Sequence, residues 1–244
     1  MTEKLFIDEA EKRQWFDQNF AEVSEKIEAA CKASGRTRSE VILLAATKTV
    51  PVGVINYAIE KGIDYVGENR VQEFLSKKDE LSTKAHRHFI GHLQTNKVKD
   101  IVGLVEMIES VHSLKLAAEI NKVSEAKGIV TDILVEVNIG NEESKSGFLA
   151  DEVEQAVTEM AKMPHIKVKG LMTIPPICEN NAEATEYFAK MRKLFIDIRD
   201  KKLDNVNMEY LSMGMSDDYE TAILNGANIV RIGTSLFGKR NYNL

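Results

Sequence analysis

The chain has 244 residues, 43% of them hydrophobic, and a formal net charge of −6. That length suits one large α/β domain or two small ones, and the hydrophobic fraction is ample for a buried core. Because acidic and basic residues are mixed along the whole chain without a basic face, we expect neither nucleic acid nor an anionic membrane as a partner.

The first residues, MTEKLFIDEAEKRQWF, carry charge in every turn. They lack the apolar stretch of a signal peptide, and no segment reaches the length of a membrane span, so we expect a cytoplasmic protein. The first predicted element is a helix from about Asp8 to Ser34, expected to pack outside the barrel described next or across its floor. Cys31 and Cys178 lie far apart without CxxC spacing, which predicts free thiols.

From Val41 onward, short β-rich runs alternate with helical patterns, which is typical of a parallel sheet with helical crossovers. The predicted strands cover residues 41–48, 65–69, 88–93, 107–113, 132–139, 168–174, 208–214 and 229–237. Clear helices are predicted at 113–128, 150–163 and 184–200, the first with Gly128 as its C-terminal stop.

Eight strands are the number that closes a (β/α)8 TIM barrel, and no Pro-, Gly- or Ser-rich linker divides the chain. The predicted fold class is therefore α/β, with one barrel domain over residues 1–244 and residues 1–40 forming an extra N-terminal helix on it. An open doubly wound sheet is the alternative, but the GxGxxG turn after its first strand is missing.

The first predicted strand, VILLAATK, ends in Lys48. Alternation puts Ile42, Leu44, Ala46 and Lys48 on one face. If this face lines the barrel, the ammonium lies in an apolar pocket, where its pKa falls and the neutral amine becomes a nucleophile toward carbonyls, as a Schiff base requires. The alternative is a lysine whose side chain bends out to water.

Histidines cluster in and after the third predicted strand, in RHFIGHLQTNKVKD. They lack the carboxylate or cysteine spacing of a persuasive metal site, so no metal is predicted. His86 and His88 are interpreted as surface or packing residues.

The seventh predicted strand runs out through LSMGMSDD. Ser212 and Gly214 border a turn, and Ser216 is expected to cap the helix that begins in DDYETAIL. Backbone amides at that helix start, approached past Gly214, form a candidate anion site. Asp217 and Asp218 also suit the positive end of the helix dipole, so simple capping is the alternative.

The eighth predicted strand carries RIGTSLFG, and loops after strands seven and eight of barrels commonly bind phosphate. Gly233 and Thr234 can supply backbone and hydroxyl donors there. Arg231 lies on an apolar strand, where a guanidinium needs an acceptor. The acceptor is either a ligand or a carboxylate such as Glu68 or Glu136.

Seven segments stand in the order found in the YggS-like pyridoxal phosphate homeostasis family: LLAATKTVP, GENRVQE, HFIGHLQTNK, VNIGNEESKSGF, GLMTIPP, LSMGMSDDYETAI and VRIGTSLFG. The resemblance covers about residues 10–240. It implies a barrel of the alanine-racemase type that carries pyridoxal 5'-phosphate (PLP) as a Schiff base on Lys48. The cofactor-binding residues that it implies are Lys48, Asn69, Met172, Ser212, Met213, Gly214, Arg231, Gly233 and Thr234, with no catalytic residue and no metal ligand.

The resemblance implies a non-catalytic carrier that holds PLP, buffers the free aldehyde and supplies it to PLP-dependent apo-enzymes of amino-acid metabolism. We expect a monomer or a weak dimer. The alternative is a PLP-dependent amino-acid racemase or decarboxylase. Related barrel racemases use a second, β-rich domain with an acid/base tyrosine, whereas only eleven residues follow Gly233, so racemisation is expected to be slow or absent. A third hypothesis is a phosphosugar lyase that uses Lys48 without a cofactor.

Overall fold

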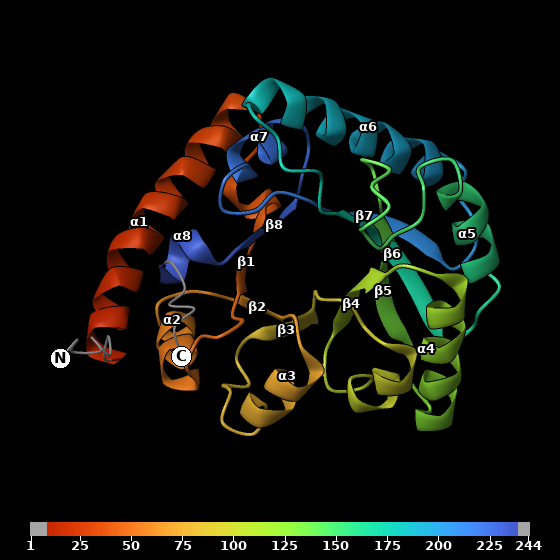
Figure 1. The fold of residues 1–244 in the computed structure, drawn as a ribbon, viewed down its shortest axis with the longest axis horizontal. Coiled ribbons are helices and arrows are strands. Elements are labelled where there is room, and N and C mark those ends of the chain that lie inside the picture. Colours follow the sequence, from red (N-terminus) through yellow and green to blue (C-terminus); the bar gives the residue numbers. More distant parts are fainter. Residues whose placement is uncertain (1–8, 239–244) are drawn as a thin grey trace.

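The computed structural model describes residues 9–238, in which eight parallel strands close into a barrel in chain order (Figure 1). The strands are β1 (Ile42–Ala46), β2 (Tyr65–Glu68), β3 (His86–Phe89), β4 (Met107–Val111), β5 (Thr131–Val137), β6 (Ile166–Thr173), β7 (Val206–Ser212) and β8 (Ile229–Ile232). The closure is made between β1 and β8, where Leu44 lies opposite Arg231. The predicted (β/α)8 barrel is therefore confirmed.

Helices connect the strands and cover the outside of the barrel (Figure 1). They are α1 (Glu9–Ala33), α2 (Val52–Glu60), α3 (Val71–Lys77), α4 (Leu114–Lys127), α5 (Val153–Met160), α6 (Asn181–Asp200), α7 (Tyr219–Leu224) and α8 (Thr234–Phe237), with 3-10 helices η1 (Arg38–Glu40) and η2 (Thr95–Asp100). The local signals act as predicted in α4. The Ser113 hydroxyl accepts the Leu116 N–H at its start, and Gly128 ends it with a φ of 65°.

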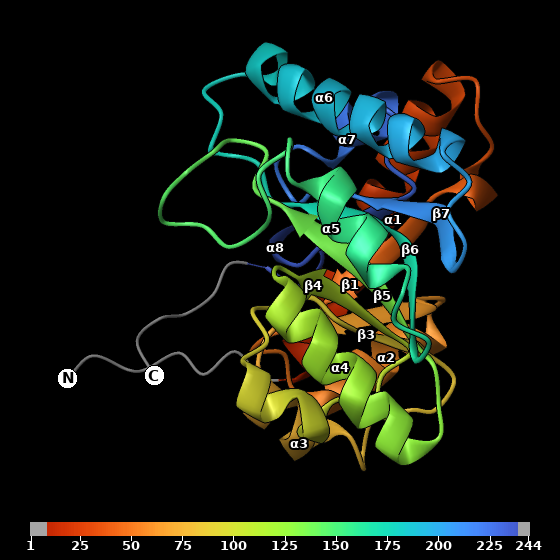
Figure 2. The same ribbon diagram turned by 90° about the vertical axis from the view of Figure 1, so that its right-hand side faces the viewer.

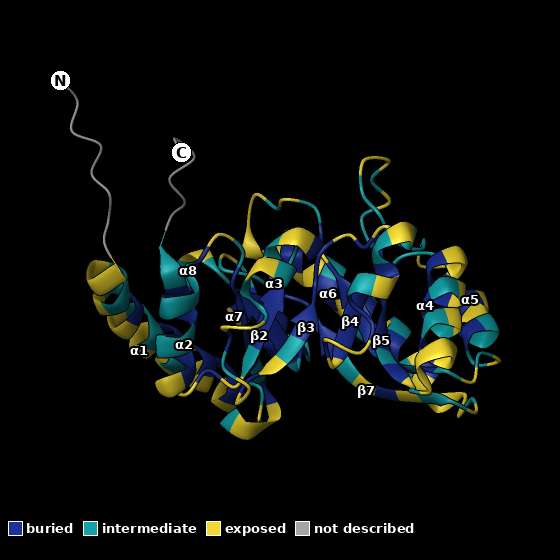
Figure 3. Ribbon diagram, turned by 90° about the horizontal axis from the view of Figure 1, so that it is seen from below, coloured by how far each residue is buried: buried dark blue, intermediate teal, exposed yellow. Residues whose placement is uncertain are grey.

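The alternation of side chains along each strand divides the core into two layers. Leu43 and Ala45 of β1 pack outward in the large cluster beneath the helices, whereas Leu44 and Ala46 pack inward with Ile229. Figure 3 shows the result, with buried strands surrounded by helices whose outer faces are exposed. The barrel interior is thus a packed core, and a ligand can reach only its ends.

The N-terminal helix lies along the outside of the barrel, where it packs against α2, α7 and α8 (Figure 1). The ring of Phe16 stacks on Phe20 and on Phe237 of α8, and meets the edge of Tyr57 of α2. Of the two predicted positions, the outer flank is therefore the observed one. The predicted first residue, Asp8, lies outside the described residues.

The strands that matter most for the site end earlier than predicted. β1 ends at Ala46 rather than at residue 48, and β8 ends at Ile232 because the chain turns at Gly233 into α8. In α8, Leu236 is fully buried, and its carbonyl accepts a hydrogen bond from Asn19 of α1. Within residues 9–238, no helix combines the length and apolarity needed to cross a membrane. Cys31 and Cys178 are free thiols, as predicted.

Candidate functional site

Residues predicted to form a site converge at one end of the barrel. Because all eight strands are parallel, the segments that follow them emerge on the same side. Lys48 follows β1, Asn69 follows β2, Gly214 follows β7, and Gly233 and Thr234 follow β8. Figure 2 shows α8 and the loop between β5 and α5 on this side. The structure therefore brings these predicted residues to the same end of the barrel.

Lys48 lies in a turn just beyond the barrel wall. The wall extends to Thr47, whose backbone N–H donates to the Gly67 carbonyl at 2.9 Å. Lys48 itself is half-buried, and Thr49 after it has a φ of 65°. The predicted alternation thus holds through Ala46, but a turn rather than strand geometry presents the lysine.

Each of the two last loops contains a glycine that a neighbouring element approaches closely. Gly214 has a φ of 95°, and a Cβ there would lie 2.5 Å from the Cβ of Ala222. A Cβ on Gly233 would lie 3.2 Å from the carbonyl oxygen of Ala46, two residues before Lys48. The loop after β8 therefore lies against the end of β1, beside the turn that holds Lys48.

The loops after β7 and β8 are also tied to each other. The Ser216 hydroxyl accepts the Ser235 N–H at 3.2 Å, and the Ser235 hydroxyl donates to the Ser216 carbonyl at 3.3 Å. The prediction that Ser216 caps the following helix is wrong, since the N-cap of α7 is Asp218, whose carboxylate accepts the Met215 N–H at 2.6 Å. Ser216 joins two loops because β7 and β8 are neighbours.

A chain of buried polar side chains crosses the barrel interior below this end, and we call it the inner network. Nδ1 of His88 on β3 lies 2.6 Å from Oε1 of Glu109 on β4. The Ser212 hydroxyl on β7 donates to the other Glu109 oxygen at 2.6 Å and accepts from Arg231 on β8 at 2.6 Å. Arg231 also donates to the Thr173 carbonyl at 2.8 Å. The inner network thus links five strands.

The inner network keeps its carboxylate ionised. Burial by itself would raise the pKa of Glu109, but interaction with His88, the charge of Arg231 and the Ser212 hydroxyl hold that pKa below its ordinary value. A buried guanidinium and a buried carboxylate therefore compensate each other, and hydrogen bonds to Ser212 and to the Thr173 carbonyl hold Arg231 in place.

The inner network decides between alternatives that the sequence left open. Of the two histidines interpreted as surface or packing residues, His88 is packed inside the barrel, whereas His86 is exposed and pairs with Glu106. Glu68 is not the partner of Arg231, because it points outward and pairs with Lys77 of α3 at 2.8 Å. Neighbouring residues of a strand face opposite sides, so Asn69, rather than Glu68, belongs with the barrel end.

Glu109 is a residue of the inner network that the sequence motifs did not single out. The available signal was a single carboxylate within the otherwise uncharged β4 segment MIESV, whose residues are all buried. Such a residue needs a cation or several donors. Its partners could not be named, because Ser212 lies 103 residues away in the chain.

Two predicted methionines have different positions. Met172 is fully buried inside the barrel and packs with Met107, Leu134 and Tyr210. Met213 packs outward with the helices, and its N–H is bonded to the Ile229 carbonyl at 3.1 Å. Met213 therefore has neither a side chain nor an N–H directed to the barrel interior.

Glu136 of β5 is the second carboxylate near Arg231. Its Oε2 atom is buried without a hydrogen-bond partner. Burial raises the pKa of this group from 4.5 to about 7, and the charge of Arg231 opposes the rise only in part. Glu136 is therefore harder to ionise in the folded chain than in the unfolded chain. The folded chain is most stable, as far as Glu136 is concerned, below about pH 4.5, where the carboxyl is protonated in both states. This stability is lost as the pH rises through about 7.

We expect Glu136→Gln to remove this penalty. Without any ligand, the variant should gain stability relative to the parent as the pH rises. The difference between their free energies of unfolding should increase by about 2 to 3 kcal/mol from pH 5 to pH 8. Urea unfolding at both pH values measures this change. Glu154→Gln, at an exposed carboxylate, should show no such rise. An equal response of the two variants would contradict an anomalous titration of Glu136.

Within residues 9–238 there is no group of three or more His, Cys, Asp and Glu side chains placed to hold a metal ion. The stacked rings of His92 and His112, 4.4 Å apart between centroids, lie near the β5–α5 loop, where Ser146 contacts His92. The candidate site thus consists of Lys48, several small residues of the neighbouring loops and, below them, the inner network.

The chain is similar to known proteins in both sequence and fold. The family model of the alanine racemase N-terminal domain matches residues 20–241. A pyridoxal phosphate homeostasis protein of Aquifex aeolicus is 45% identical over 226 residues, which are 92% of this chain and 98% of that protein. PipY of Synechococcus elongatus, solved with PLP bound, is 27% identical with a TM-score of 0.77, over 88% of this chain and 100% of PipY. Alanine racemase of Clostridium difficile, 16% identical with a TM-score of 0.71, shares the fold, and the match covers 93% of this chain and 57% of that enzyme.

Proposed function

We propose a function from one premise: the chain belongs to the family of pyridoxal phosphate homeostasis proteins, which have the fold of the alanine racemase N-terminal domain. The chain binds PLP reversibly at the open end of its barrel, buffers the concentration of this reactive aldehyde and supplies it to enzymes that need it. PLP brings one piece of chemistry, an aldehyde that condenses with an amine to a Schiff base. Lys48 is the proposed amine.

The observation that carries the assignment of Lys48 is the position of Gly233. The loop after β8, where barrels commonly bind phosphate, touches Ala46 only two residues before the lysine. In PLP the aldehyde and the phosphate-bearing methylene group are on neighbouring atoms of one small ring, so they can reach Lys48 and this adjacent loop together. Oδ1 of Asn69 is buried without a hydrogen-bond partner, so it can accept a hydrogen bond from a ligand. Both features fit PLP.

The remaining residues have proposed roles of binding and orientation. Gly233 and Thr234 at the start of α8, with Gly214 in the neighbouring loop, surround the phosphate. Arg231, held in place by Ser212, supplies a fixed positive charge on the side of the barrel interior. Met172 contributes an apolar surface below the ring. No role is proposed for the side chain of Met213.

We propose a carrier rather than an enzyme. The support is the name, pyridoxal phosphate homeostasis protein, that is shared by relatives which this chain matches over nearly all of their length. The proposal extends to a monomer or weak dimer in the cytoplasm that supplies PLP-dependent apo-enzymes. A racemase or decarboxylase would need a group that moves a proton at the α-carbon of an amino acid.

Reduction with borohydride tests the binding site. The chain is mixed with PLP, reduced and digested, and the pyridoxyl adduct is located by mass spectrometry. We expect the adduct on Lys48. An adduct mainly on another lysine, or none, would contradict the assignment.

The same preparation tests carrier against enzyme. In deuterated water with L-alanine or L-serine, we expect α-proton exchange by NMR and the D-form by chiral chromatography to stay at background, while PLP passes to an added apo-enzyme. Turnover near one per second, as in working enzymes, and lost in Lys48→Ala, would instead establish a racemase.

A further inference from the structure

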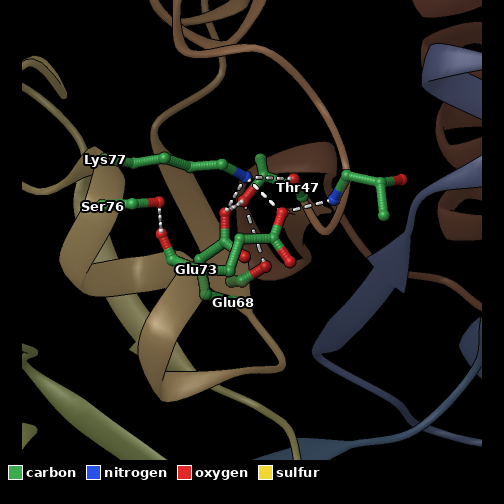
Figure 4. A network of polar contacts seen from close by, with 7 residues as sticks. Thr47, Glu68, Glu73, Ser76 and Lys77 are labelled. Carbon is green, nitrogen blue, oxygen red and sulfur yellow. Dashed lines mark hydrogen bonds and ion pairs between the residues drawn. The ribbon is translucent and has the colours of Figure 1, made fainter. Parts of the chain in front are cut away.

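A second polar cluster lies on the outer side of the barrel wall and contacts Thr47, the residue before Lys48 (Figure 4). It consists of Glu68 at the end of β2 and Glu73 and Lys77 of α3, and we call it the α3 cluster. The Lys77 ammonium donates to Glu68 at 2.8 Å and to Glu73 at 2.6 Å. Its three side chains are only 4 to 18% exposed, so the cluster is shielded from water and held in one geometry.

The α3 cluster binds the backbone on both sides of Lys48. The Lys77 ammonium donates to the Thr47 carbonyl at 3.0 Å, and the Glu73 carboxylate accepts the Thr49 N–H. That carbonyl belongs to the peptide group before Lys48, and that N–H belongs to the peptide group after it. Because a residue's φ and ψ are set by its two flanking peptide planes, the cluster fixes the backbone conformation of Lys48.

The conformation held in this way is one that the sequence does not favour. Thr49 has a φ of 65°, in the left-handed region that β-branched residues rarely adopt. Such a conformation persists only when the surroundings determine it. The Thr47 hydroxyl adds a further restraint by donating to Glu68 at 2.7 Å. The turn is also closed by its own hydrogen bond, from the Val50 N–H to the Thr47 carbonyl at 3.0 Å, and the α3 cluster adds side-chain restraints on both peptide groups around Lys48.

We propose that Lys77 is a positioning residue for Lys48. This inference rests on the proposed function: by fixing both peptide groups around Lys48, Lys77 and its partner Glu73 aim the amine at the cofactor and slow cofactor release. Lys77 touches no reacting atom, and it acts through the backbone of residues 47–49. The sequence alone does not indicate this role, because Lys77 is one of several charged residues near the end of α3.

The test compares Lys77→Met with Lys78→Met. Lys78 is the next residue along, and its ammonium pairs with Asp79 rather than with the Lys48 turn. Each chain is loaded with PLP, which gives a visible absorption band, and release is followed by the activity that an excess of added PLP-dependent apo-enzyme regains. Circular dichroism in the same band reports how rigidly the cofactor is held, and melting of the cofactor-free chains reports the structural cost.

We expect Lys77→Met to release PLP roughly tenfold faster or more, with a weakened circular dichroism band, while Lys78→Met behaves as the parent. Loss of Lys77 leaves both Glu68 and Glu73 without their cation, and the double variant Lys77→Met/Glu68→Gln neutralises Glu68, the more buried of the two. It should show the same fast release at a melting temperature closer to that of the parent. If Lys77→Met alone does not fold, release from the double variant tests the positioning role instead.

Unchanged release and dichroism in the double variant, with a parent that takes its adduct on Lys48, would overturn the positioning role and leave the proposed function standing. A lower melting temperature without faster release would likewise assign Lys77 a structural role only. A parent that takes no adduct on Lys48 would overturn the proposed function, and this inference with it.

Discussion

Replacing Lys48 by alanine is expected to abolish the visible absorbance that PLP acquires on binding, while the chain stays folded. The substitution removes the amine that a Schiff base requires. Lys48 is half-buried in a turn rather than in the core, so the free energy of unfolding should change by less than about 1 kcal/mol. Absorbance after dialysis and urea unfolding of the cofactor-free chain measure the two effects.

Lys145→Ala is a matched control for this experiment. Lys145 is also half-buried, lies in the β5–α5 loop at the same end of the barrel, and donates to the Pro175 carbonyl at 2.9 Å. We expect this variant to keep the visible band. A Lys48→Ala chain that stays yellow after dialysis would show that another lysine holds the cofactor.

Replacing Glu109 by alanine is expected to lower the free energy of unfolding by about 3 to 5 kcal/mol. Glu109 is fully buried, and its removal leaves Arg231 without the carboxylate that compensates it and leaves His88 and Ser212 without their acceptor. Urea unfolding of the cofactor-free chain measures the loss. Since ionised Glu109 stabilises the folded chain, the parent should also lose stability as the pH falls below the ordinary range of a glutamate.

Glu106→Ala provides the control for burial. Glu106 is paired with His86 at the same 2.6 Å that separates Glu109 from His88, but both partners are about half exposed. An exposed pair contributes about 0 to 1 kcal/mol, so this variant should be close to the parent in stability. Similar losses in the two variants would contradict the view that burial makes the Glu109 carboxylate important.

These two residues show how stability and binding are divided in this barrel. Glu109 lies in the inner network, which fixes Arg231, while Lys48 lies in a turn that contributes little to the core. Loss of Glu109 is therefore expected to act on the whole fold, and loss of Lys48 only on the ligand. Glu136 combines features of both residues. It affects the stability of the fold, as Glu109 does, but only through its ionisation, because its buried Oε2 atom has no hydrogen-bond partner in the protein.

Local patterns along the chain are enough to predict the order of elements and which residues follow the strands at the same end of the barrel. Alternating apolar residues, helix stops such as Gly128 and eight β-rich runs are local features, and local features set secondary structure. Parallel strands then bring their following loops together whatever the details of packing. For this reason the sequence suffices to place Lys48, Asn69, Gly214 and Gly233 at one end.

Which polar groups meet depends instead on how the elements pack. Glu109 and Ser212 are 103 residues apart, and no local pattern specifies a contact across the barrel. The same holds for Ser216, whose hydroxyl bonds to α8 instead of capping α7, and for Glu68, whose partner lies outside the barrel rather than inside. The chain leaves β1 in a turn at residues 47–50, which is closed by the Val50 N–H and the Thr47 carbonyl and is held from outside by Lys77 of α3. Contacts between segments so far apart depend on three-dimensional packing, which the order of residues along the chain does not display.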